Sequence, residues 1–499
     1  MIKILIAPSD HHGVGHFRSI WPAQVIRQEF GDKISVEINL DVDTNNINYL
    51  KGFDIIHFHR TLGPYENMKN LMKILRSEGV ITIMDIDDYW VPPTTHPLYS
   101  LVMQEGMNHK ISDNIDIVDY VTTTTDVFAD YIRKKNPNVK VLPNALNLKD
   151  RMWNSTVKEN PNDFCRVSWI GGSSHFYDLK LLEESMMKLG NSSELKDKLQ
   201  LIVCGFDTRG SVTEILPNGE KRNRMIEPKE SIWNDFERIF TNNYRSINDK
   251  EYAKWLQEVK NEDYPNMYDK NFIRRWTLPL TKYGYHYDYC DVCLAPLEHT
   301  ETYKEIKNEK GELEHVPVTD YRPGTIKTRV NIFNEVKSEL KIIEAGFKKK
   351  VLIAQDFGIY SKIIKDGENG ILIKPEDNKK GWYKAIKEVA TNKELREKLA
   401  NNLHEYVLEN YDLKKLTEKR VSFYEYLVQN KEYVQRHQNS KSNNQIVLKD
   451  ILQKSNTSNI DRIYPVNTEV DLKQIINKVA ADFKIDEPIK TATSKNKKK

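Results

Sequence analysis

The sequence contains few cysteines. Only four occur in 499 residues: Cys165, Cys204, Cys290 and Cys293. Cys290 and Cys293 have the spacing of a redox or half-zinc motif, but no second pair accompanies them, and they run directly into the strand-like VCLAPL. We therefore interpret the cysteines as small buried side chains rather than as reactive or metal-binding groups.

Long apolar runs and an excess of one charge are also missing. No apolar run approaches the length that crosses a bilayer, and the initial MIKILIAP lacks the long apolar region and cleavage site of a signal peptide. The 75 basic and 72 acidic side chains give a formal charge of +3, so no global charge directs the protein to nucleic acid or to an anionic membrane. These absences predict a cytoplasmic protein without a transmembrane segment.

What is present is a repeated alternation of short apolar runs and helical patterns. The runs are KILIAP, ISVEINL, DIIHFH, VITIMDID, DYVTTTT and VKVLP in the first part, then RVSWIGG, LQLIVCG, DVCLAPL, KKKVLIAQD and NGILI. Continuous apolar strands separated by helices are typical of parallel sheets that are covered on both faces. The sequence therefore predicts an α/β protein with two doubly wound, Rossmann-like domains.

The composition suggests the domain boundaries. We predict a first Rossmann-like domain over 1–155, a second over 156–400, C-terminal helices over 401–430 that pack back towards the first domain, and a polar, partly disordered tail over 431–499. An insert over about 206–289, rich in charge and aromatics, is expected to be α-rich, and 301–324 is expected to be a polar loop. No pattern assigns a role to the insert or the tail, or an oligomeric state.

A glycine-containing loop follows the first strand of the first domain. Ligands of open α/β sheets bind beyond the carboxyl ends of the strands, which makes this position informative. In SDHHGVGHFRS, Gly13 and Gly15 permit a tight turn beside His16. The third glycine of a dinucleotide fingerprint is absent, because Arg18 stands there, so the loop predicts a phosphate or sugar contact rather than an NAD site.

A second glycine loop follows the first strand of the second domain. In IGGSSHFYDL, Gly171 and Gly172 bring backbone N–H groups close to a ligand, and Ser173 and His175 add side-chain donors. A plain glycine-rich turn is the alternative.

The stretch NEVKSELKIIEAG combines two features of a nucleotide site. Asn334, Lys337 and Ser338 are predicted at the amino end of a helix, where the N–H groups and the dipole favour a phosphate. Lys341 and Glu344 follow on the same face as Lys337, and a carboxylate accepts both hydroxyl protons of a ribose. A solvated helix surface remains the alternative.

With these motifs the chain resembles retaining GT-B glycosyltransferases of the broad family 4 group found in bacteria and phages. The motifs are GVGHFR, DIIHFH, VLPNALN, WIGGSSHFYDL, DVCLAPL, KSELKIIEAG and DGENGILI, over about residues 1–430. The resemblance implies two domains facing a crevice, a hexosyltransferase-like reaction with a nucleotide-sugar donor in the second domain, and no metal or other cofactor. Glu344-Ala345 matches the family's second Glu, whereas Val336 stands where the first is expected, with Glu335 one place off; Asn334 or Lys337 is expected to serve instead.

The family's histidine after the fourth strand also has no counterpart, because that strand ends in MDIDDYW. A retaining reaction in which the departing phosphate accepts the proton needs no protein nucleophile, but it needs positive charge at the diphosphate and groups that orient the sugars. We predict Lys337 at the diphosphate, Asp87 or Asp88 at the acceptor hydroxyl or the developing oxocarbenium charge, and His16 as a further candidate.

Other functions are compatible with parts of this pattern. The Asp-x-Asp of DIDD is how GT-A transferases hold a divalent metal, although such enzymes have one sheet domain. An isomerase or hydrolase of nucleotide-sugars, and a catalytically impaired binding or structural protein, would use the same scaffold. The donor base, the donor sugar and the acceptor, which is a glycan, a lipid-linked sugar, a protein or DNA, stay open.

Overall fold

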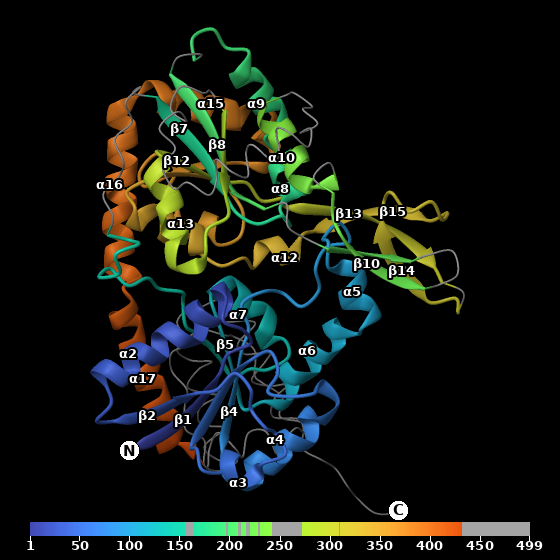
Figure 1. The fold of residues 1–499 in the computed structure, drawn as a ribbon, viewed down its shortest axis with the longest axis vertical. Coiled ribbons are helices and arrows are strands. Elements are labelled where there is room, and N and C mark those ends of the chain that lie inside the picture. Colours follow the sequence, from blue (N-terminus) through green and yellow to red (C-terminus); the bar gives the residue numbers. More distant parts are fainter. Residues whose placement is uncertain are drawn as a thin grey trace, which may run out of the picture. The chain divides into compact units, whose positions relative to one another are not determined.

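The computed structural model describes residues 1–154, 164–195, 198–207, 211–215, 220–227, 230–241, 272–308 and 310–431. Parts of the predicted insert and nearly all of the predicted tail therefore lie outside the described residues. The described chain forms two compact units (Figure 1). Unit 1 comprises Met1–Trp90, Gly106–Pro143 and the described residues from Lys414 on, and unit 2 comprises Val91–Glu105 and Asn144–Leu413. The sequence places the division near residue 155, whereas the units change between Pro143 and Asn144.

Unit 1 is built on a six-stranded parallel sheet with the order β2-β1-β3-β4-β5-β6. The strands are β1 (Ile2–Ala7), β2 (Ile34–Ile38), β3 (Ile55–His59), β4 (Ile81–Asp85), β5 (Tyr120–Thr123) and β6 (Val139–Val141). All six coincide with predicted apolar runs. The central strands β3, β4 and β5 are buried along their whole length, as expected for a sheet covered on both faces.

The helices of unit 1 connect these strands. They are α1 (Gly13–Gly15), η1 (His16–Ile20), α2 (Trp21–Glu29), α3 (Ile47–Leu50), η2 (Tyr65–Asn67), α4 (Met68–Ser77), α6 (Met107–Ile117) and α7 (Asp126–Arg133). The Thr125 side chain caps α7 by accepting a hydrogen bond from the Phe128 N–H. The late helix α17 (Leu413–Gln429) returns to this unit, where Phe423, Tyr424 and Leu427 join the apolar core of the sheet.

Unit 2 contains a second six-stranded parallel sheet, with the order β11-β8-β7-β12-β16-β17. Its strands are β7 (Cys165–Ile170), β8 (Leu199–Phe206), β11 (Phe272–Trp276), β12 (Val292–Ala295), β16 (Val351–Gln355) and β17 (Ile371–Ile373). Five of them coincide with predicted runs. The sixth, β11, comes from the end of the insert, so the expectation of an α-rich insert is wrong at this point: FIRRW extends the sheet by pairing with β8.

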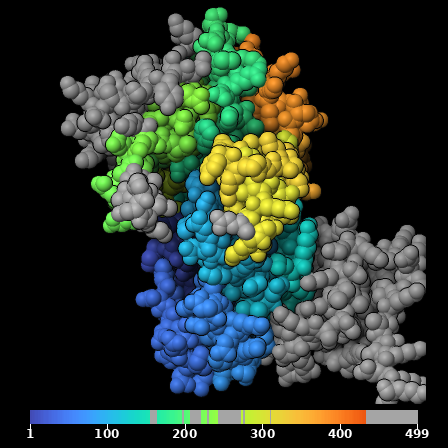
Figure 2. Space-filling view, turned by 90° about the vertical axis from the view of Figure 1, so that its right-hand side faces the viewer, coloured from blue at the N-terminus to red at the C-terminus, as the bar shows by residue number. Residues whose placement is uncertain are grey.

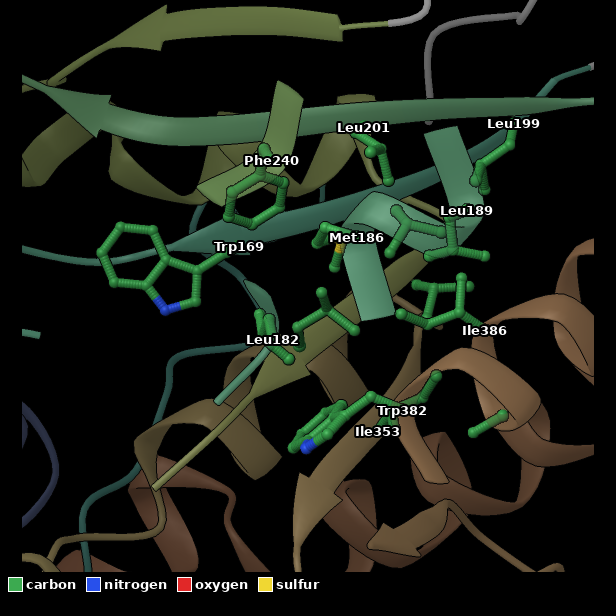
Figure 3. Packing of buried hydrophobic residues seen from close by; sticks show 14 of the residues in the cluster. Trp169, Leu182, Met186, Leu189, Leu199, Leu201, Phe240, Ile353, Trp382 and Ile386 are labelled. Atoms are coloured by element: carbon green, nitrogen blue, oxygen red, sulfur yellow. The ribbon is translucent and has the colours of Figure 1, made fainter. Parts of the chain in front are cut away.

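Unit 2 contains eleven helices among the described residues. They are α5 (Tyr99–Gln104), α8 (Phe176–Lys180), α9 (Glu183–Gly190), α10 (Ile232–Thr241), η5 (Leu280–Tyr289), α12 (Ile332–Glu335), α13 (Leu340–Phe347), α14 (Tyr360–Ile363), η6 (Pro375–Asp377), α15 (Asn378–Thr391) and α16 (Lys393–Asn410). Side chains of α9, α10 and α15 form one apolar core with β7 and β8 (Figure 3). Trp382 and Ile386 of α15 and Met186 and Leu189 of α9 lie at its centre, all nearly inaccessible to solvent.

Two small antiparallel sheets are added to unit 2. One is the hairpin of β9 (Ser211–Ile215) and β10 (Lys221–Met225). The other has the order β14-β13-β15 and consists of β13 (Thr300–Lys307), β14 (Leu313–Pro317) and β15 (Thr325–Val330). The prediction of a polar loop over 301–324 is therefore wrong, because β13 and β14 take up half of this segment; Figure 2 shows this sheet (yellow) at the surface.

The cysteines are buried and unpaired, as predicted. Burial raises the pKa of the Cys290 thiol to about 11 and that of Cys204 to about 12, which keeps both protonated at neutral pH. Across the part of the chain that the structure describes, no helix is both long enough and apolar enough to cross a membrane.

Candidate functional site

The strand orders locate two crevices, one in each unit. In unit 1 the order reverses between β1 and β3, and in unit 2 it reverses between β7 and β12. Open α/β sheets bind ligands outside the carboxyl ends of the strands at such a switch point.

An open pocket lies at the switch point of unit 2. The loop after β7 contributes Ser174 and His175, the residue after the β12 turn is Glu298, and Asn331 and Lys337 flank α12. The walls include Pro93, Tyr177 and Phe333. Concave sites that combine apolar walls with a few polar groups are typical of small-molecule sites.

Asp178 fixes the geometry of this pocket. Its Oδ1 accepts hydrogen bonds from the Glu298 backbone N–H at 2.7 Å and from the Asn334 amide at 2.8 Å, and its Oδ2 pairs with His175 Nδ1 at 2.8 Å. The same Asn334 amide also donates to the Glu298 carbonyl at 3.1 Å. One carboxylate thus ties α8, the β12 turn and α12 together.

Glu298 differs from its acidic neighbours. Burial raises its pKa to about 7, and the negative charges of Asp178 and Glu301 add to the effect. A carboxyl group that changes its protonation state near neutral pH inside a pocket is a functional-site candidate. The sequence analysis missed Glu298, although it directly follows DVCLAPL; the rule that ligands lie beyond strand ends would have found it.

The predicted nucleotide helix begins later than expected. Asn334 belongs to the separate short helix α12, and α13 starts only at Leu340, so Lys337 and Ser338 lie in the connection. The Asn331 side chain caps the start of α12 by accepting from the Asn334 N–H. The prediction of one continuous helix start at 334–338 is therefore wrong. Lys337 lines the pocket, and its contact with a phosphate stays a prediction.

Lys341 and Glu344 form a buried polar group with two tyrosines. Lys341 Nζ lies 3.0 Å from the Tyr283 hydroxyl and 3.5 Å from Glu344 Oε2, and the Tyr287 hydroxyl donates to the same Oε2 at 2.6 Å. Burial opposes the charge of Lys341, but Tyr283 and Glu344 outweigh it and hold its pKa above the usual range. The ammonium therefore stays charged, and η5 supplies two partners that the sequence analysis missed.

The two glycines of the loop after β7 differ: Gly171 is tightly packed, whereas Gly172 is surrounded by free space. A side chain at Gly171 would place its Cβ 2.5 Å from the Trp169 ring, and the Gly171 N–H donates to the Cys204 carbonyl at 3.3 Å. Gly171 is therefore required for packing. Gly172 and Ser173 are exposed, and a Cβ at Gly172 would meet nothing within 4 Å.

In unit 1 the loop after β1 is shaped by Asp10. Its Oδ1 accepts from the His12 and Gly15 N–H groups at 2.7 and 3.2 Å, and a Cβ at Gly15 would lie only 1.9 Å from the Asp10 carbonyl oxygen. A Cβ at Gly13 would meet nothing within 4 Å, and the His16 ring bonds through Nδ1 to the His12 carbonyl at 2.9 Å. Gly15 is thus needed for the turn, and the ligand roles of Gly13, Gly15 and His16 stay predictions.

Asp87 has a histidine partner that the sequence analysis did not assign. His59, at the end of β3, lies 2.9 Å through Nε2 from Asp87 Oδ1, and Arg60 Nη2 lies 3.3 Å from the same oxygen. Burial alone would raise the pKa of Asp87, but His59 and Arg60 outweigh it and hold that pKa below the usual range. Arg60 has a left-handed backbone with φ 59°, a strained conformation that is often found at functional sites.

The carboxylate of Asp85 is bonded to groups inside the protein. Asp85 accepts from Arg18 Nε at 2.9 Å, from Arg18 Nη2 at 2.8 Å and from the Thr122 hydroxyl at 2.6 Å. Its charge is therefore neutralised inside the protein. In the described ranges, no group of three or more His, Cys, Asp or Glu side chains is placed to hold a metal ion.

Each unit contains a doubly wound parallel sheet with one switch point. Two such domains, one after the other along the chain, are the defining feature of the GT-B proteins. Residues 340–406, from α13 into α16, match the family model described as Glycosyl transferases group 1. The match covers the stretch that carries Lys341 and Glu344. The predicted class, a glycosyltransferase with the GT-B fold, is confirmed by this match together with the two parallel sheets.

Several solved structures are similar to the chain over most of its length. The UDP complex of HepE from Anabaena has 10% identity and a TM-score of 0.49, covering 86% of this chain and 100% of that one. Sucrose-phosphate synthase from Thermosynechococcus elongatus has 13% identity and a TM-score of 0.49, covering 86% and 99%. A glycosyltransferase from Rickettsia africae has 12% identity and a TM-score of 0.47, with the same coverage of 86% and 99%. No curated protein sequence matches the chain.

Proposed function

We propose that the chain moves a sugar from a nucleotide-sugar donor to an acceptor, with retention of the anomeric configuration. The observation that carries the proposal is the arrangement of Lys337, Lys341 and Glu344. Lys337 lines the pocket at the switch point of unit 2, and Lys341 and Glu344 follow it in the segment that matches the glycosyltransferase model.

Each of these side chains has a distinct task in the proposed reaction. Lys337 and Lys341 neutralise the diphosphate as the bond to the sugar breaks, because the leaving group gains negative charge in the transition state. Both hydrogen bonds of Glu344 among the described residues are made by Oε2, to Tyr287 and Lys341, and we assign Oε1 to a ribose hydroxyl. The exposed Gly172 and Ser173 face the same switch point as backbone and hydroxyl donors.

We assign the acceptor to unit 1. Asp87, oriented by His59 and Arg60, is the carboxylate that holds an acceptor hydroxyl, with Asp88 and His16 as neighbouring candidates. In a retaining reaction of this kind the departing phosphate accepts the hydroxyl proton, so Asp87 orients the acceptor and need not act as a nucleophile.

The reaction is proposed to need no bound metal. We expect full activity in EDTA, since the lysines supply the positive charge that a divalent cation would otherwise provide. Activity that disappears in EDTA and returns with Mn²⁺ or Mg²⁺ would contradict this and favour a metal-dependent transferase.

The experiment measures binding and slow donor hydrolysis for UDP-, GDP-, ADP- and TDP-sugars with the purified protein. Glu344→Gln preserves volume, so weaker binding reports the lost ribose contact; Lys337→Met tests the diphosphate contact. Lys362→Met and Glu376→Gln, which change exposed side chains outside the pocket, are the matched controls. The proposal is supported if one donor is bound and hydrolysed, and if its affinity falls about tenfold or more in both site variants but in neither control.

Two other results would change the assignment. Binding of no nucleotide or nucleotide-sugar at all would indicate a scaffold that kept the fold and lost the reaction. Release of free sugar at full speed without any acceptor would instead indicate a nucleotide-sugar hydrolase.

A further inference from the structure

The three-stranded sheet of unit 2 has one open edge. Its outer strands are β14 and β15, because the strand order is β14-β13-β15. α5 lies against β14, where the Tyr99 hydroxyl donates to the His315 carbonyl at 2.8 Å, and Pro317 ends that strand. Among the described residues no further strand pairs with β15, and none of its six residues is buried.

This edge lacks the features that usually prevent a strand from pairing with another chain. Natural edge strands are protected by prolines, by bulges or by charged side chains. β15 contains no proline and pairs with β13 in an unbroken register. Its two cations are paired within the sheet: Lys327 Nζ lies 2.5 Å from Glu305 Oε2. Arg329 Nε lies 2.8 Å from Glu301 Oε2.

One face of β15 is apolar. Ile326 is 59% exposed and Val330 is 50% exposed, and Thr328 lies between them on the same face, because alternate residues of a strand share a face. The Thr328 hydroxyl lies 3.3 Å from that of Thr302 on β13. Pairing with a further strand would remove part of this β-branched, apolar surface from water.

The sequence of β15 is complementary to itself. In an antiparallel pair centred on Thr328, Ile326 of each copy lies opposite Val330 of the other, and the two threonines face one another, which is a favourable cross-strand pair. On the other face Lys327 lies opposite Arg329 of the second copy, and the glutamate that each cation already contacts limits the repulsion. The edge thus carries no unpaired charge that would select a strongly acidic or basic peptide.

We propose that β15 pairs with β15 of a second copy of this chain, which joins the two three-stranded sheets into one. The contact uses the same strand on both copies, so it closes as a dimer and does not continue into a filament. A single pair of short strands buries less surface than a permanent dimer does, so we expect dissociation in the micromolar range. No residue of β15 lines the unit 2 pocket, and the inference does not depend on the proposed function.

A cysteine at the centre of the strand pair tests the register. All four native cysteines are buried, so Thr328→Cys adds an exposed thiol to a chain whose other thiols are inaccessible. Opposed residues of antiparallel strands have Cα atoms about 4.5–5.5 Å apart, within the reach of a disulfide. Thr302→Cys is the matched control, because Thr302 is exposed and is the register partner of Thr328 on β13. Its two copies would be three strand spacings apart, about 14 Å.

Mild oxidation is therefore expected to cross-link Thr328→Cys into a dimer and to leave Thr302→Cys monomeric. Equal cross-linking of the two variants would indicate random collision and would contradict the proposal. Failure of Thr328→Cys to cross-link would contradict it as well.

Sedimentation velocity measures the association without any cross-link. We expect the wild type to change from monomer to dimer between about 1 and 300 µM. Thr328→Lys and Thr328→Glu each place like charges opposite one another and should weaken the dimer about tenfold or more, whereas an equimolar mixture of the two should associate at least as well as the wild type. Thr302→Lys should behave as the wild type, and melting curves show whether each variant is folded.

Two results of this measurement would overturn the inference. A wild-type chain that stays monomeric over the whole range would leave the β15 edge to a strand of another protein. A dimer that both charged variants leave unchanged would have its interface elsewhere.

Discussion

At the scale of single residues, Glu298 links the pocket to the stability of unit 2. Its pKa is raised in the folded protein from 4.5 to about 7, so the wild-type protein loses stability as the pH rises through this range. Glu298→Gln removes the ionisation. We expect the variant to gain on the order of 2 kcal/mol relative to wild type between pH 5 and pH 8. Urea unfolding at both pH values measures the free energy of unfolding of each protein. The same change with pH in the wild type and the variant would contradict the prediction.

The Arg18–Asp85 pair is the corresponding feature of unit 1. Both side chains are 1% exposed and they share two hydrogen bonds, at 2.8 and 2.9 Å. Asp85→Ala would leave a buried guanidinium without its carboxylate, and we expect a loss of about 3–5 kcal/mol in the free energy of unfolding. The double variant Arg18→Met/Asp85→Leu removes both charges and should recover much of that loss. If the double variant is as unstable as Asp85→Ala, the unpaired guanidinium is not the cause of the lost stability.

At the scale of elements, the β13–β15 sheet is an addition to unit 2. Thr300 and Val330 are register partners at its base, so a short turn can join them when 301–329 are removed. We expect the parallel sheet to keep its core and the melting temperature to change by less than about 4 °C. The segment 91–105 should become more accessible to protease, because it loses the bonds from Thr94 to Glu301 and from Tyr99 to the His315 carbonyl. Scanning calorimetry and mass spectrometry of the digest measure the two effects; an unfolded deletion variant would contradict the first.

The same sheet shows where prediction from sequence ends. All eleven predicted strands of the two parallel sheets exist. Each is a continuous apolar run, as expected for a strand in a sheet that is covered on both faces. Between β13 and β15, Glu301 pairs with Arg329 and Glu305 pairs with Lys327. Because charged residues occupy these positions, the sequence lacks the alternation of apolar and polar residues that would predict a strand. β11 was missed for a similar reason, since FIRRW lies inside a polar, aromatic segment.

The site could be predicted in part. The strand-end rule identified the loops after β1, β4 and β7 and the segment before α13, and Lys337 and His175 do line one pocket. It did not identify His59, Arg60 and Glu298, although all three also follow strands, because their importance depends on partners far away in the sequence. His59 matters through Asp87, and Glu298 matters because burial, together with the charges of Asp178 and Glu301, raises its pKa.

At the scale of the whole molecule, unit 1 depends on a helix from the far end of the described chain. Tyr424 of α17 is completely buried, and its hydroxyl lies 2.7 Å from His57 Nδ1 in the sheet core. A chain that ends at residue 412 lacks Tyr424, Phe423 and Leu427 and should leave unit 1 open. We expect hydrogen exchange to lose protection in β1, β3 and β4 while β7, β12 and β16 stay protected. Equal protection in both units would contradict this.

This discontinuous construction of unit 1 has a consequence for biosynthesis. The strands of unit 1 cannot complete their core when they are synthesised, because α17 is made only after all of unit 2. Unit 2 has its whole sheet between Cys165 and Ile373 and can finish folding as soon as its last helix emerges. Unit 2 can therefore complete its core before unit 1 does. The strands of unit 1 keep apolar surface exposed, and accessible to chaperones, until α17 has been synthesised.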